Sequence, residues 1–171
     1  ALPLLGEERD RYVVKLPDGN PGRLLKRDAA PGVDEDGWTA VGRGSVEDIV
    51  KDAQSLKTVA YTWGGTSSLT GFDCSGLVQA VFRVHGFKLP RDAHQQAGEG
   101  KPVSLKDVRK GDLLFFADPA RKKKPVTHVG LALERDLYLE AGSYWPVSLD
   151  RENPQYSEAR AKTFVGARRV L

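Results

Sequence analysis

The stretch around Cys74 constrains the fold more than any other part of this 171-residue chain. A glycine-rich loop, Tyr61–Gly71, leads into Phe72–Gly76, and a run from Leu77 to His85 follows. Apolar residues recur in this run at helical spacing, which predicts a helix with one face in the core. The residues expected on that face are Leu77, Val78, Val81 and Phe82.

The expected caps of this helix place Cys74 in its first turn. Asp73 is a suitable N-cap, and Gly86 follows the last turn. Unpaired N–H groups and the helix dipole favour an anion in this first turn, so the pKa of the Cys74 thiol should fall. A thiol with a lowered pKa is suited to act as a nucleophile. Cys74 is the only cysteine, so it forms neither an intramolecular disulfide nor a thiolate cluster for zinc. The alternative is a small buried side chain without chemistry, which is the usual role of a single cysteine.

A histidine far downstream favours chemistry. His128 lies 54 residues after the cysteine (128 − 74), on a segment whose alternation predicts a strand. His128, Gly130 and Ala132 share one face of that strand, and we expect the small residues to leave room for the Cys74 helix. A cysteine with a distant histidine is typical of thiol acyl-transfer enzymes. The alternative is a buried His128 that only satisfies hydrogen bonds.

Five blocks occur in one order along the chain: Tyr61–Gly65, Phe72–Val78, Leu89–Arg91, Gly111–Phe116 and Thr127–Gly130. This order resembles the NlpC-type cysteine peptidases of bacterial cell walls, a papain-like group, from about Ser45 to Leu171. The resemblance implies an α+β fold in which N-terminal helices pack on an antiparallel β-sheet. It also implies a peptidase domain over residues 44–171.

The resemblance implies a catalytic site of three residues. Cys74 and His128 would be the reacting pair, and a third polar residue would orient the imidazole. The family commonly has His, Asn or Gln at that third position, whereas this chain has Glu140. A carboxylate can accept the imidazole N–H and favours the charged ring. An exposed strand residue is the alternative for Glu140.

Three further residues are implied to contact the substrate. The hydroxyl of Tyr61 would hold the substrate or its oxyanion, beside the backbone N–H of Cys74. Asp73 and Ser75 match family positions that bind the amine and carboxylate of the peptide. Helix capping is the alternative for both. Trp63, Gly64 and Gly65 are expected to shape the loop rather than to contact the substrate.

The activity implied is hydrolysis of peptidoglycan stem peptides between γ-D-glutamate and the diamino acid, through an acyl-enzyme. A catalytically silent wall-binding module and an amidase of the same fold are the alternatives. The expected partners are muropeptides, and the expected place is the bacterial envelope or the exterior, with recycling of wall fragments in the cytoplasm as the alternative. No cofactor is expected, because three scattered histidines give no metal-ligand spacing.

The first part of the chain predicts a small β segment over residues 1–43. Arg11–Leu16 alternates polar and apolar residues, Pro17–Asn20 is a turn signal, and Gly22–Lys26 would complete a hairpin. Asp10–Gly19 resembles the distal hairpin of a bacterial Src-homology-3-type barrel. Because few residues are available, the resemblance implies a partial barrel that docks beside the active site, with a plain packing hairpin as the alternative.

Other elements follow from caps and alternation. Pro31–Gly37 predicts a linker, Ser45 caps a helix over Val46–Leu56, and Asp92 begins a short helix that ends at Gln96. The predicted strands are Asp112–Ala117, Thr127–Leu133, Leu137–Ala141 and Lys162–Val170.

Composition argues against two other classes of protein. The 26 basic residues are mixed with 23 acidic ones, for a net charge of +3, so nucleic-acid binding is not expected. No stretch approaches the roughly 18 apolar residues of a membrane helix.

Two short segments allow further expectations. Ala1–Leu5 is too short for a signal peptide, so we expect a mature or trimmed form. Arg121–Lys124 predicts a solvated loop, or a contact with anionic wall polymers.

Overall fold

The computed structural model describes residues 4–15, 20–25, 44–118, 120, 126–142 and 146–171. Contacts divide the chain into two compact units, Ala1–Gly44 with Val84–Phe87, and Ser45–Arg83 with Lys88–Leu171. The assignment of residues 1–43 to a partial barrel and of 44–171 to a peptidase domain stays a prediction.

The smaller unit contains a three-stranded antiparallel sheet in the order β1-β2-β3. Its strands are β1 (Leu4–Glu7), β2 (Arg11–Lys15) and β3 (Pro21–Leu25). The pairing of β2 with β3 confirms the expected hairpin, whereas β1 was not predicted. The predicted turn lies partly, and the predicted linker wholly, outside the described residues.

Three helices of the larger unit form where the sequence predicts them. Helix α1 (Val46–Ser55) begins with a capping box, in which Ser45 and Asp48 each accept a hydrogen bond from the other's backbone N–H. Helix α2 (Cys74–Val84) buries the apolar face expected of it. Helix α3 (Ala93–Gln96) is the short helix expected after Asp92. The 3₁₀ turn η1 (Leu105–Asp107) and helix α4 (Glu158–Thr163) were not predicted.

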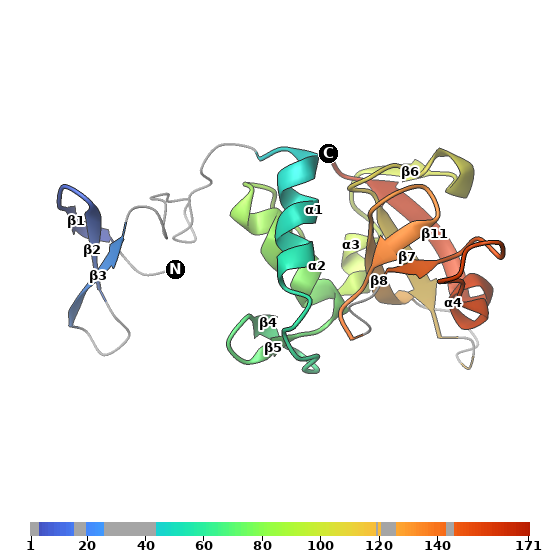
Figure 1. The fold of residues 1–171 in the computed structure, drawn as a ribbon, viewed down its shortest axis with the longest axis horizontal. Helices are drawn as coiled ribbons and strands as arrows, with labels where there is room; N and C mark the ends of the chain where they lie inside the picture. The colour runs from blue at the N-terminus through green and yellow to red at the C-terminus, as the bar shows by residue number, and fades with distance from the viewer. Residues whose placement is uncertain (1–3, 16–19, 26–43, 119, 121–125, 143–145) are drawn as a thin grey trace. The chain divides into compact units, whose positions relative to one another are not determined.

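The larger unit is built on a six-stranded antiparallel sheet in the order β10-β9-β8-β7-β11-β6. Figure 1 shows α1 and α2 on one side of this sheet and α4 on the other. A separate two-stranded sheet, β4-β5, precedes α2. The bounds are β4 (Thr66–Ser67), β5 (Gly71–Phe72), β6 (Lys101–Val103), β7 (Leu113–Ala117), β8 (Val126–Ala132), β9 (Leu137–Leu139), β10 (Val147–Ser148) and β11 (Phe164–Arg169).

The small residues of β8 serve a different purpose from the one expected. A Cβ atom on Gly130 would lie 2.4 Å from Cδ2 of Tyr138, whose side chain is fully buried. Ala132 belongs to the same core cluster as Tyr138 and Phe116. The prediction that these residues make room for the Cys74 helix is therefore wrong, because the space is taken by an aromatic ring from β9.

Candidate active site

The thiol of Cys74 lies close enough to the imidazole of His128 for each group to shift the pKa of the other. Cys74 starts α2 and is 7% exposed, while His128 lies on β8. Burial raises the pKa of the thiol, but the hydrogen bond and charge of His128 and the backbone N–H of Val129 outweigh it. The net effect holds the pKa of Cys74 below its usual range, which favours a thiolate.

A carboxylate contacts the other side of the imidazole. Nε2 of His128 lies 2.6 Å from Oε2 of Glu140, directly after β9. Glu140 is 6% exposed, so the alternative of an exposed strand residue is wrong. Because Nε2 contacts Glu140, Nδ1 is the ring nitrogen that remains available to another partner. The three predicted catalytic side chains therefore lie in one row, with His128 between Cys74 and Glu140.

Ionisation in this row favours the charged forms. Burial lowers the pKa of His128, but hydrogen bonds with Cys74 and Glu140, and their charges, raise it above its usual value. Burial raises the pKa of Glu140, but the hydrogen bond and charge of His128, together with Arg160, lower it below the usual range. The environment thus supports thiolate, imidazolium and carboxylate side by side.

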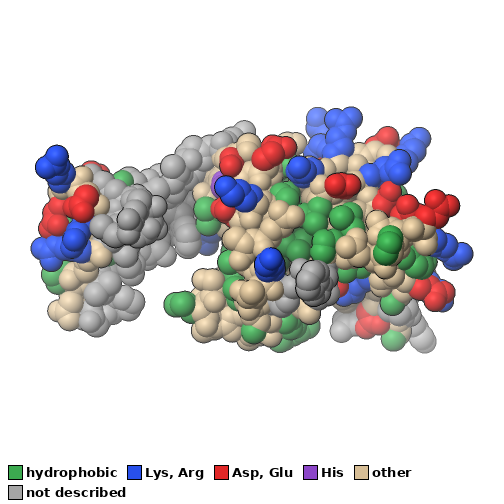
Figure 2. All heavy atoms as spheres, viewed as in Figure 1, with side chains coloured by type: hydrophobic (Ala, Val, Ile, Leu, Met, Phe, Trp, Pro, Cys, Tyr) green, Lys and Arg blue, Asp and Glu red, His purple; other side chains and the backbone are tan. Residues whose placement is uncertain are grey.

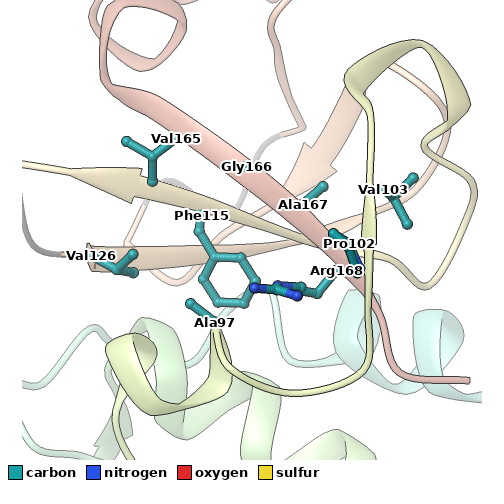
Figure 3. Close-up of a pocket in the computed structure, with 9 residues that line it drawn as sticks. All are labelled: Ala97, Pro102, Val103, Phe115, Val126, Val165, Gly166, Ala167 and Arg168. Carbon is teal, nitrogen blue, oxygen red and sulfur yellow. The ribbon is translucent and has the colours of Figure 1, made fainter.

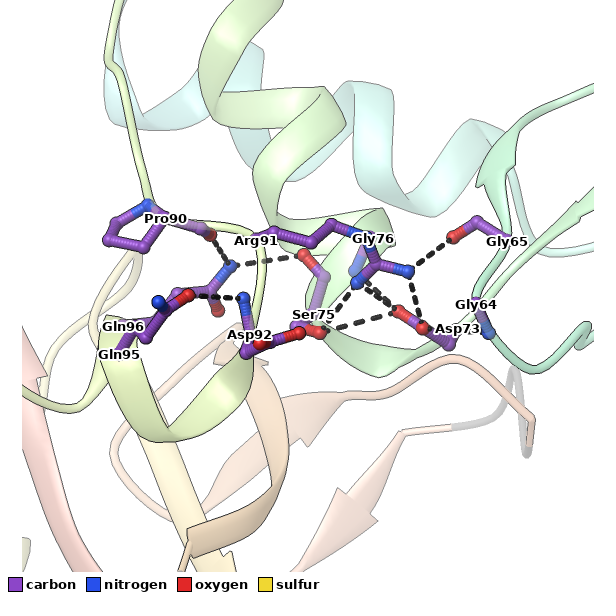
Figure 4. Close-up of polar contacts among 10 residues, drawn as sticks. All are labelled: Gly64, Gly65, Asp73, Ser75, Gly76, Pro90, Arg91, Asp92, Gln95 and Gln96. Carbon is purple, nitrogen blue, oxygen red and sulfur yellow. Dashed lines mark hydrogen bonds and ion pairs between the residues drawn. The ribbon is translucent and has the colours of Figure 1, made fainter.

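Asp73 and Ser75 are engaged at the start of α2 (Figure 4). Oδ1 of Asp73 accepts the Gly76 N–H at 2.7 Å, and Oδ2 accepts the Gly64 N–H at 3.0 Å. Arg91 donates to both oxygens, at 3.0 and 2.6 Å, and to Oγ of Ser75 at 3.0 Å. Burial raises the pKa of Asp73, but the Arg91 and backbone donors lower it overall. These contacts confirm that Asp73 caps the helix.

The substrate role of these two residues stays a prediction. The carboxylate of Asp73 also accepts the Ser75 hydroxyl at 3.3 Å, so five donors meet about four lone-pair sites. A substrate amine would have to share or displace one of these donors.

Sequence reasoning gave Arg91 no role at the site. The Leu89–Arg91 block, one of the five that carry the family resemblance, was the signal that could have indicated one.

Tyr61 lies within electrostatic range of the thiol. Burial raises the pKa of its hydroxyl, and the negative charges of Cys74 and Asp73 raise it further, against the opposing charge of Arg160. Its side chain is 41% exposed, and a Cβ atom on Gly142 would lie 3.3 Å from its ring. Tyr61 thus lies near the site while remaining partly exposed to solvent.

The loop beside Tyr61 carries exposed apolar side chains. Trp63 is 87% exposed and Leu69, between β4 and β5, is 93% exposed. Figure 2 shows that the surface over β4 and β5 is mostly uncharged. The glycines shape this loop as expected, because a Cβ atom on Gly65 would lie 2.4 Å from the backbone oxygen of Gly71.

An open hollow of about 350 Å³ lies along β6, β7 and β11. Figure 3 shows the side chains of Phe115 and Arg168 reaching into it. None of the residues that line it is among those expected at the active site. The lining residues are Ala97, Pro102, Val103, Phe115, Val126, Val165, Gly166, Ala167 and Arg168.

Two other kinds of feature are missing from the described residues. No three His, Cys, Asp or Glu side chains among them gather in a way that could hold a metal ion. No helix in the same part of the chain is both long and apolar enough to cross a membrane.

Comparison with known families decides what kind of protein carries this site. A profile of the NlpC/P60 family matches residues 58–169. The chain belongs to the NlpC/P60 family. Membership confirms the resemblance given by the five sequence blocks, and the helices packed on an antiparallel sheet confirm the expected α+β fold.

NlpC/P60 relatives resemble the chain in sequence and in structure. It is 38% identical over 130 residues to a γ-D-glutamyl-L-lysine dipeptidyl-peptidase of Bacillus subtilis, spanning 76% of this chain and 40% of that protein. An NlpC/P60 crystal structure from Bacillus cereus superposes with a TM-score of 0.81 at 29% identity, covering 99% of this chain and 53% of that one. The chain thus spans about half or less of these two relatives' length.

A third NlpC/P60 member differs in activity. RipD of Mycobacterium tuberculosis is described as a non-catalytic domain protein adapted to peptidoglycan binding. Its structure superposes with a TM-score of 0.56 at 25% identity, covering 74% of this chain and 97% of that one. Family membership by itself therefore does not decide between catalysis and binding.

Proposed function

We propose that this protein is a cysteine peptidase that hydrolyses peptidoglycan stem peptides, with Cys74 as nucleophile, His128 as general acid and base, and Glu140 as the orienting residue. The observation that carries the proposal is the row itself, in which the imidazole of His128 contacts Glu140 at 2.6 Å and lowers the pKa of the Cys74 thiol. A wall-binding module has no need of a lowered thiol pKa, whereas a nucleophile does.

The chemistry follows from the positions of the three side chains. The thiolate of Cys74 attacks the carbonyl carbon of the scissile amide, and the imidazolium of His128 gives its proton to the leaving nitrogen. The resulting thioester is hydrolysed by water, from which His128 takes a proton. Glu140 keeps the ring aligned and stabilises its charged form.

The oxyanion needs donors close to the sulfur. The backbone N–H of Cys74 lies in the first turn of α2, where N–H groups have no intrahelical acceptor. We assign it, with the Tyr61 hydroxyl, to the developing negative charge. Asp73 and Ser75 are proposed to meet the polar ends of the peptide by exchanging one of their present partners.

The bond that we propose is the one between γ-D-glutamate and the diamino acid. The name of the B. subtilis relative supports this choice, since it specifies a γ-D-glutamyl-L-lysine substrate for that protein. A peptidase acting on such peptides would work in the bacterial envelope or outside it, or on released wall fragments in the cytoplasm.

Turnover of defined muropeptides tests the proposal. The wild-type protein is incubated with stem peptides that contain L-lysine or diaminopimelate, and products are identified by mass. We expect cleavage after γ-D-glutamate, loss of activity in Cys74→Ala and His128→Gln, and retention in His94→Gln, which changes an exposed histidine on α3. Release of an intact stem peptide from the sugar would instead indicate an amidase. Wall binding without products would indicate a silent module.

A further inference from the structure

Arg160 forms the far end of the row of side chains at the candidate active site. It lies on α4, and its Nη2 atom donates to Oε1 of Glu140 at 3.0 Å. The other oxygen, Oε2, contacts His128 at 2.6 Å. The carboxylate therefore bridges an imidazole on one side and a guanidinium on the other.

One buried aromatic ring supports both of these partners. The Phe116 ring lies 5.5 Å from Cζ of Arg160 and 5.9 Å from the centroid of His128. Phe116 is 1% exposed and is held in turn by Tyr138 and Phe164, with centroids at 5.1 and 6.0 Å. Stacking on a fixed ring gives the guanidinium a defined position, although α4 has only 6 residues.

Charge explains why a fixed cation is useful at this place. Glu140 is almost fully buried, and burial favours the neutral carboxyl group. A neutral carboxyl group could donate a hydrogen bond to the imidazole of His128, whereas the carboxylate can only accept one. The groups that act on Glu140 include His128 from β8 and Arg160 from α4; its own charge acts on Tyr138 from β9, and Cys74 acts on His128. Among these, only arginine cannot lose its charge in the physiological range.

We propose that Arg160 is a positioning residue of the catalytic site, which holds Glu140 as the anionic acceptor that orients His128. The role of Arg160 in turnover depends on the proposed function, whereas its effect on the pKa of the Cys74 thiol does not. Without the guanidinium, a proton can settle on Glu140, the imidazolium loses its acceptor, and the Cys74 thiolate becomes harder to form.

The pH dependence of Cys74 alkylation by iodoacetamide tests this without any substrate. We compare the wild-type protein with Arg160→Gln, Arg160→Lys and Lys162→Gln. Lys162 is the matched control, because it is a cation on the same helix whose side chain is 70% exposed and pairs with Glu158. We expect the midpoint of alkylation to rise by about half to one pH unit in Arg160→Gln, less in Arg160→Lys, and not at all in Lys162→Gln.

Turnover separates positioning from a purely structural role. We expect kcat of Arg160→Gln to fall by about 10-fold with little change in KM, and the acidic limb of its pH profile to move upward. Equal alkylation profiles for Arg160→Gln and Lys162→Gln would overturn the proposal. If circular dichroism shows that Arg160→Gln is unfolded, the alkylation profile of Arg160→Lys is used instead. An Arg160→Lys profile equal to that of Lys162→Gln would then overturn the proposal.

The two proposals fail in different ways. A wild-type protein that cleaves no muropeptide, but whose thiol midpoint still depends on Arg160, refutes the peptidase and supports the positioning role. A protein that cleaves muropeptides equally well with or without Arg160 refutes the positioning role and leaves the peptidase standing.

Discussion

Replacing Arg91 by methionine tests whether the network at the start of α2 holds the larger unit together. The change removes two donors from Asp73, at 2.6 and 3.0 Å, and one from Ser75, at 3.0 Å. It leaves a carboxylate whose side chain is 12% exposed with fewer partners. Methionine keeps much of the apolar stem, so the loss reports mainly on the guanidinium.

The expected cost follows from burial. Removing one partner of a buried ion pair costs about 3–5 kcal/mol. Because the Arg91 side chain is 32% exposed and Asp73 keeps its backbone donors, we expect a smaller loss of about 2–3 kcal/mol. The matched control is Lys162→Met, which breaks an exposed pair of similar length, 2.8 Å, and should cost about 0.3–0.5 kcal/mol.

The measurement is the free energy of unfolding from urea titration, followed by far-UV circular dichroism. Arg91→Met should shift the transition of the larger unit clearly below that of Lys162→Met. Equal losses for the two variants would show that the Asp73–Arg91 pair contributes no more than a surface pair. The reasoning from burial would then be refuted.

Three further results are expected. Gly130→Val should destabilise the protein by about 1–3 kcal/mol in the same titration, since its side chain would collide with the buried Tyr138 ring; unchanged stability would contradict the proposed packing. Alkylation of Cys74 should proceed well below the usual thiol pKa of about 8.5, and an ordinary titration curve would count against the His128 pair. Since the folded-state pKa of Asp73 is lowered, its contribution is present above the unfolded pKa and is lost as pH falls through the folded value; acid unfolding should therefore begin at higher pH in Arg91→Met.

Local signals in the sequence predicted helices α1 to α3 and the elements that carry Cys74 and His128. The cap at Asp73, the apolar spacing after it and the alternation around His128 are short-range features, and each appears in the structure at the expected residues. The third side chain, Glu140, was placed by the resemblance to a family and contacts His128 in the structure.

Contacts between distant segments were not predictable in the same way. Arg160 comes from a helix too short to give a periodic pattern, and its partner Glu140 lies 20 residues away. The role predicted for Gly130 was wrong because the residue that packs against it, Tyr138, lies on the neighbouring strand. Which residue lies there is set by strand register and not by local sequence. Short strands such as β4, β5 and β10 carry too few residues for alternation to show.

The place of β11 in the sheet has a consequence for synthesis. This strand is formed by residues 164–169, yet it lies between β7 and β6 rather than at an edge. A nascent chain that has already released Cys74, His128 and Glu140 from the ribosome still lacks an interior strand of the sheet. We therefore expect the thiol to keep an ordinary pKa until translation has passed residue 169, because only then can the polypeptide close its sheet. The hydrolysis that we propose would begin no earlier.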